Sequence, residues 1–148
     1  MSIVLNHWKH KFPAQKLSIM MLTIKTALLL LLTMGQRQQG LHLIDVRNLE
    51  IKYDRIIIRF GDPLKTTNPN FHQGEIPILA YPKDKRICPV WYLKKYLEIT
   101  NTYRNHNRLF LINIKPFTPA SKSTISKWIK KALEFAGIDM NIFYSAFN

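Results

Sequence analysis

The stretch LLLLLTMGQRQQGLHLIDV, residues 28–46, determines how the rest of the chain is interpreted. Its five leucines end an apolar run that starts near residue 16 and has no polar face, which is typical of a helix buried on all sides. Gly35 can adopt the positive φ that ends a helix. Arg37 stands just beyond it, with glutamines on both sides. The stretch therefore predicts a buried helix over residues 16–33 that presents an arginine just past its end.

Composition indicates one domain-sized unit with a strong positive charge. The chain has 148 residues, of which 47% are hydrophobic, enough for a folded core. Lys and Arg number 22 against 9 Asp and Glu, giving a net charge of +13. A domain this basic usually binds an anionic partner. Nucleic acid is the first candidate partner, and an acidic membrane surface is the second.

Metal and cofactor chemistry find no support in the sequence. Cys88 is the single cysteine, which excludes an internal disulfide and a cysteine-based metal site. The five histidines are scattered without the spacing that is typical of metal ligands. We therefore expect no metal site and no cofactor.

Two features argue against a membrane span in the leucine-rich run. A spanning helix needs ~20 consecutive apolar residues with few charges, whereas Thr23, Lys25 and Thr26 interrupt this run. A secretory signal would place its apolar region nearer Met1 and follow it with a cleavage site of small residues. We therefore interpret the run as a core helix and expect no membrane partner.

The middle of the chain predicts a small antiparallel sheet. Residues 48–53 alternate apolar and polar side chains, and residues 55–60 follow a turn at Asp54, as in a β-hairpin. A third strand is predicted over residues 75–81, at a sheet edge because Pro77 lacks a backbone donor. Together with the helices, this predicts an α+β fold that is mainly helical, with a small three-stranded antiparallel sheet.

Two further helices are predicted after the sheet, and the second has one basic face. The first covers residues 89–100, because proline is favoured at a first helical position. The second covers residues 124–136, with Ser123 as the expected N-cap. Its apolar residues share one face: Ile125, Trp128, Ile129, Ala132 and Leu133. Lysines occupy the other face or just precede the helix: Lys122, Lys127, Lys130 and Lys131. Such a face is most often only solvated, and contact with phosphates is the competing interpretation.

Four stretches together resemble the catalytic domain of tyrosine recombinases, the phage-integrase family. They are LTIKTALLLLLTMGQRQQGLHLIDV, LKTTNPNF, ICPVWYLKKYLEIT and STISKWIKKALEFAGIDMNIF. The resemblance is closest to recombinases of DIRS-type and related eukaryotic mobile elements. It implies a partial tyrosine-recombinase catalytic core over residues 16–148. The mixed composition of residues 1–15, with Pro13 and basic residues, predicts an N-terminal arm before this core. The resemblance also implies double-stranded DNA as the partner, a role in DNA recombination and integration, and location in the nucleus.

The resemblance assigns roles to two residues. In that family a tyrosine hydroxyl attacks a DNA phosphodiester, and arginines stabilise the negative charge of the transition state. The resemblance implies that Arg37 is the first of these arginines and that Lys65 is the hairpin lysine that protonates the leaving oxygen. If the resemblance is set aside, the residues alone predict that Arg37 is a solvated residue beyond a helix C-terminus. Lys65 is then a solvated loop residue, with Lys52 and Arg59 as nearby rivals.

The sequence also departs from the family pattern. In the family a His-x-x-Arg box, a later His or Trp and the nucleophilic tyrosine follow a segment like GIDMNIF. Here no arginine follows Arg108 and no histidine follows His106, and Tyr144 lies well short of the nucleophile's place. The resemblance thus implies a fragment that does not cleave DNA alone, with self-association through apolar surface that truncation exposes. Two alternatives stay open: a non-enzymatic basic nucleic-acid-binding module and a basic membrane-surface protein.

Overall fold

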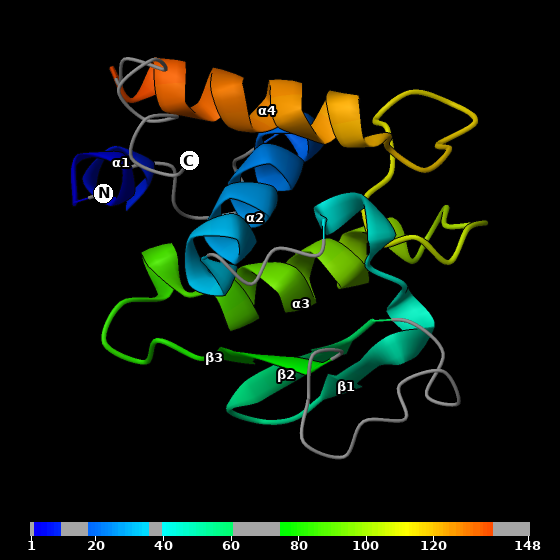
Figure 1. The fold of residues 1–148 in the computed structure, drawn as a ribbon, viewed down its shortest axis with the longest axis horizontal. Coiled ribbons are helices and arrows are strands. Elements are labelled where there is room, and N and C mark those ends of the chain that lie inside the picture. Colours follow the sequence, from blue (N-terminus) through cyan, green and yellow to red (C-terminus); the bar gives the residue numbers. More distant parts are fainter. Residues whose placement is uncertain (1, 10–17, 36–39, 61–74, 138–148) are drawn as a thin grey trace.

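A computed structural model describes residues 2–9, 18–35, 40–60 and 75–137 (Figure 1). Within them lie four α-helices: α1 (Ser2–Lys9), α2 (Ile19–Met34), α3 (Pro89–Thr100) and α4 (Lys122–Phe135). The strands are β1 (Leu49–Ile51), β2 (Arg55–Arg59) and β3 (Glu75–Leu79). Three short 3₁₀ helices connect them: η2 (Leu41–Leu43), η3 (Val46–Asn48) and η4 (Lys85–Ile87). These elements confirm the predicted α+β fold with a small three-stranded antiparallel sheet.

Helix α2 is the centre of the core. The Ser18 hydroxyl caps its N-terminus by accepting from the Met21 backbone N–H at 3.2 Å. Every residue from 22 to 30 is buried, because α3, α4 and β3 all pack against this helix. Figure 1 shows α4 on one side of α2, with α3 and the sheet on the other. The prediction of a helix buried all round is confirmed, and Gly35 ends it with φ 57°.

The sheet has the order β1-β2-β3, and both pairs are antiparallel. The inner face of β2 and β3 carries four buried isoleucines, which pack in the core. They are Ile56, Ile58, Ile76 and Ile78. Pro77 lies on β3, an edge strand, as its missing donor predicted.

Helix α3 begins and ends where the sequence predicted. Pro89 is its first residue, and Cys88 is the N-cap, whose sulfur accepts from the Trp91 backbone N–H at 3.5 Å. The Cys88 side chain is buried, and Val90 and Leu93 face the core. The cysteine therefore has a packing and capping role.

The start of helix α4 and the N-terminal segment differ from expectation. The prediction that Ser123 caps the last helix was wrong: α4 starts at Lys122, and the Ser121 hydroxyl accepts from the Thr124 backbone N–H at 3.1 Å. Ser123 lies in the first turn of α4. Residues 2–9, expected as part of an incoming arm, form helix α1 with a fully buried Trp8.

Within the described residues, no helix is both long and apolar enough to cross a bilayer. Exposure of the leucine-rich helix α2 is limited to its ends, where Met20 is 39% exposed. Self-association through exposed apolar surface stays a prediction.

Candidate nucleic-acid interface

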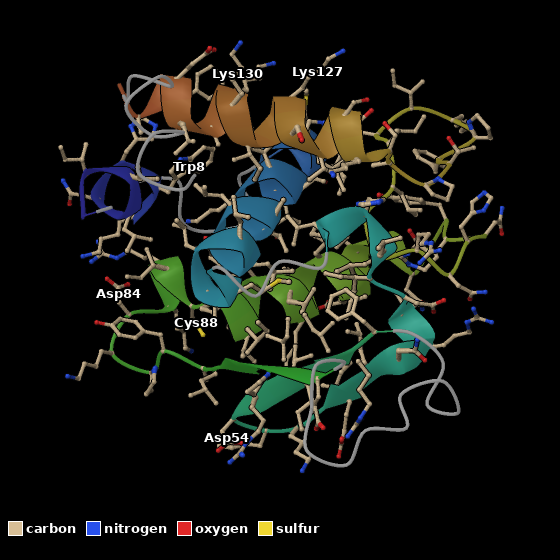
Figure 2. All side chains as sticks on the ribbon, in the orientation of Figure 1. Trp8, Asp54, Asp84, Cys88, Lys127 and Lys130 are labelled. Atoms are coloured by element: carbon tan, nitrogen blue, oxygen red, sulfur yellow. The ribbon has the colours of Figure 1, made fainter. Side chains whose placement is uncertain are left out.

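Helix α4 carries the basic surface that the sequence indicated. The five predicted core residues on its inner face are all buried, and Trp128 meets Phe110 edge-on with ring centroids 6.4 Å apart. The four lysines are exposed, with Lys122 in the first turn and the other three along the outer face. Figure 2 shows Lys127 and Lys130 pointing away from the body of the protein, on the side of α4 opposite α2. The packing of the inner face thus fixes which side of α4 faces solvent.

Seven cations elsewhere on the described surface pair with carboxylates, whereas the exposed Lys83, Lys85 and Lys115 have no carboxylate oxygen within 4.0 Å among the described residues. Arg59 on β2 pairs with Glu50 at 2.7 Å and with Glu75 at 3.4 Å. Arg86 in η4 pairs with Asp84 at 2.9 Å, and the hydrogen bond from its guanidinium lowers the pKa of Asp84 to about 2. Arg47 likewise pairs with Asp45 at 2.7 Å and lowers the pKa of that carboxyl. Much of the sheet-side charge is therefore compensated locally.

The lysines of α4 lack this compensation. None of the four is within 4.0 Å of a carboxylate oxygen among the residues that the structure describes. The helix has one acidic residue, Glu134, also exposed, so four lysines and one glutamate leave a surplus of three positive charges. Uncompensated charge on one convex helix face suits the phosphates of a nucleic-acid backbone.

The two residues assigned by resemblance, Arg37 and Lys65, lie outside the described residues. In the chain, Arg37 stands between α2 and η2, and Lys65 between β2 and β3. Their approach to a common phosphate stays a prediction. The two rivals to Lys65 are engaged elsewhere, because Lys52 pairs with Glu50 at 3.4 Å and Arg59 with two glutamates.

Two buried residues, Lys25 and Trp8, have roles in the structure that the sequence did not predict. Lys25, in the middle of α2, is fully buried, and its ammonium group donates to the Trp8 carbonyl at 2.6 Å. Trp8 is itself fully buried between α1, α2 and α4 (Figure 2). The sequence signal for Lys25 is its position as a lone cation inside a run that is apolar on every face. A cation buried there needs hydrogen-bond partners that are also buried.

Three comparisons with known proteins complete this description. No family model, no curated protein and no solved structure matches the chain. The described residues contain no group of three or more His, Cys, Asp or Glu that could hold a metal ion.

Proposed function

We propose that this chain binds double-stranded DNA through the exposed lysines of α4, as a fragment of a tyrosine-recombinase catalytic domain. The observation that carries the proposal is the uncompensated lysine face of α4 on a chain of charge +13. DNA carries closely spaced phosphates, and lysines that neutralise them release counterions, which supplies most of non-specific affinity. Roles in DNA recombination and integration, and location in the nucleus, belong to the same proposal.

The order of elements supports the recombinase part of the proposal. A buried helix, then the segment with Arg37, a three-stranded antiparallel sheet and two helices follow one another along the chain. This order resembles that of the tyrosine-recombinase catalytic domain. The packing of α2 against both α3 and α4 would hold the end of α2 rigid, which a phosphate-binding arginine requires.

A non-enzymatic DNA-binding module is the second candidate. The sequence favours it at one point, because these 148 residues lack the His-x-x-Arg box that the recombinase chemistry needs. Both candidates predict salt-dependent DNA binding, and they differ in whether the chain descends from a strand-cleaving enzyme. A basic membrane-surface protein is the third candidate, and it predicts binding to anionic vesicles in preference to DNA.

Binding to duplex DNA should be weak and steeply salt-dependent. We expect a dissociation constant of ~10⁻⁴–10⁻⁶ M at physiological salt, with little sequence preference, because lysines contact phosphates without reading bases. Fluorescence anisotropy with a labelled duplex, repeated from about 50 mM to about 200 mM salt, measures the slope. Affinity that does not change over that range, or a clear preference for anionic vesicles, would contradict the proposal.

Removing the outer lysines of α4 should flatten this salt slope. In the triple variant Lys127→Ala, Lys130→Ala, Lys131→Ala, the slope of log affinity against log salt should fall by up to about one unit for each phosphate that α4 no longer binds. The fold should survive, because these side chains are exposed. The control replaces Lys52, Lys83 and Lys85 with alanine, which removes three exposed lysines from the sheet and η4 side. Equal slopes in the two triple variants would show that α4 is not the interface.

A further inference from the structure

Trp8 joins α1 to two other helices. Its indole Nε1–H donates to the Ala132 carbonyl on α4 at 3.3 Å, and its own carbonyl accepts from the Lys25 Nζ on α2 at 2.6 Å. The residue is fully buried, and α1 also packs against η4. Trp8 therefore links the N-terminal helix by hydrogen bonds to both α2 and α4, in addition to the packing of Val4 in the core.

Both of these hydrogen bonds cap helix ends. The last four carbonyls of an α-helix have no partner inside the helix. Trp8 is the next-to-last residue of α1, so its carbonyl is one of these, and the amine of Lys25 supplies the missing donor. The carbonyl of Ala132 lies in the last turn of α4, where the Ala136 N–H donates to Leu133 instead. Lys25 thus caps α1, and Trp8 of α1 caps α4.

The amine of Lys25 is buried and pairs with no carboxylate among the described residues. It donates to the Tyr92 hydroxyl at 2.8 Å and lies 4.2 Å from the centroid of that ring. The charged groups that act on it electrostatically are Asp84 and Arg86 at η4, and α1 contributes His7 and Lys9 on either side of Trp8. Asp84 is shared with Lys9 and Arg86, at 3.8 Å and 2.9 Å. Burial lowers the pKa of Lys25 to about 7, the attraction of Asp84 opposes this shift, and Arg86 adds to it.

We propose that α1 is a proton-linked latch on α4, in which docking of α1 buries the amine of Lys25 against the Trp8 carbonyl, favours the neutral form of that amine and so releases a proton to solvent. When α1 leaves, Lys25 is exposed at that end and binds the proton again. The Trp8 cap on α4 is lost in the same step, so the last turn of α4 loosens with α1. This device is a property of the fold and stands whether or not α4 binds DNA.

The direction of the pH effect follows from the two states of Lys25. Its pKa is about 7 when docked and returns toward the ordinary value of 10.5 when α1 is undocked. Between these values the undocked state binds more protons, so the docked state becomes more favourable as pH rises, by up to about tenfold per pH unit. Below about pH 7 both states are protonated, and docking no longer depends on this group.

Hydrogen exchange on the full chain tests the latch. After correction for the chemical exchange rate, raising the pH from about 7 to about 9 should lower the opening constant of α1 and of the last turn of α4 by up to about fiftyfold. Amides of β2 should show a smaller change. Opening of α1 that is independent of pH, or that occurs only with unfolding of the whole chain, would overturn the proposal.

Replacing Lys25 with methionine isolates the proton. Lys25→Met keeps an apolar chain of similar length without a titrating group, so the opening of α1 should lose its pH dependence. Lys94→Met is the matched control. The Lys94 amine also donates to backbone carbonyls, those of Lys52 and Tyr53, but these hydrogen bonds are exposed to solvent. The control should keep the wild-type pH dependence, and the same dependence in Lys25→Met would overturn the proposal.

A direct titration decides the question if Lys25→Met does not fold. In the wild-type chain labelled with ¹⁵N-lysine, the amine of Lys25 should titrate with a midpoint near 7. A midpoint near the ordinary value of 10.5 would show that docking releases no proton and would overturn the latch.

Discussion

Replacing Leu30 with alanine should lower the free energy of unfolding by about 2–5 kcal/mol. Leu30 lies on α2, is fully buried and belongs to the main hydrophobic cluster. Three neighbouring elements, α3, α4 and β3, pack against this helix and cannot all move in to fill the space that the missing atoms leave. Because a domain of this size is stable by only about 5–15 kcal/mol, a large part of the stability would be lost. Urea unfolding followed by circular dichroism measures the difference.

Met20→Ala is the matched control for this prediction. Met20 lies on the same helix and is 39% exposed, so its truncation removes less buried apolar surface and leaves no closed cavity. We expect a loss of stability well below that of Leu30→Ala. Equal losses in the two variants would mean that α2 is not buried on all sides.

The helices and strands of the core were predictable because their signals are local. The leucine run has no polar face, and residues 22–30 are indeed all buried. Strand β1 follows the alternation of apolar and polar residues, β2 follows the turn at Asp54, and α3 follows the preference of proline for a first position. The N-cap of α4 was misplaced by two residues, because Ser121 and Ser123 are both good caps and only the backbone path decides between them.

The role of the N-terminal helix could not be predicted, because it depends on distant parts of the chain. The partners of Trp8 are Lys25 and Ala132, the second 124 residues away. Nothing in the eight residues of α1 indicates that its end is capped from α2, or that its indole caps α4. Contacts of this kind arise from tertiary packing, which overrides local preference.

The candidate site was predictable where it depends on helix periodicity alone. The spacing of Lys127, Lys130 and Lys131 placed them on the face opposite Trp128, and the structure exposes all three. Their lack of carboxylate partners was not predictable, because it depends on where the strands and η4 bring the acidic residues. The shared phosphate site of Arg37 and Lys65 rests on the resemblance alone.

The chain should form no covalent adduct with DNA. A recombinase requires several donors around the transferring phosphate, and losing a single donor of this kind can cost roughly 10²–10³ in rate. These 148 residues lack the second arginine, the histidine and the nucleophilic tyrosine of the family together. A nicked suicide duplex, which traps a protein linked through phosphotyrosine, should therefore give no adduct on a denaturing gel. An adduct that disappears in Tyr144→Phe would contradict this, because Tyr144 is the tyrosine after the last family-like stretch.

Phosphate binding at Arg37 should persist without that chemistry. A guanidinium holds phosphate with two parallel hydrogen bonds, which an ammonium group cannot match. We therefore expect Arg37→Ala to reduce the salt slope of DNA binding by about one unit, with Arg37→Lys keeping most of the slope but binding more weakly than wild type. Arg55→Ala is the control, because Arg55 is exposed but pairs with Asp54 at 3.2 Å. If Arg37→Ala and Arg55→Ala have equal effects, Arg37 acts as general surface charge, and the arginine that follows the buried helix has no phosphate-binding role of its own.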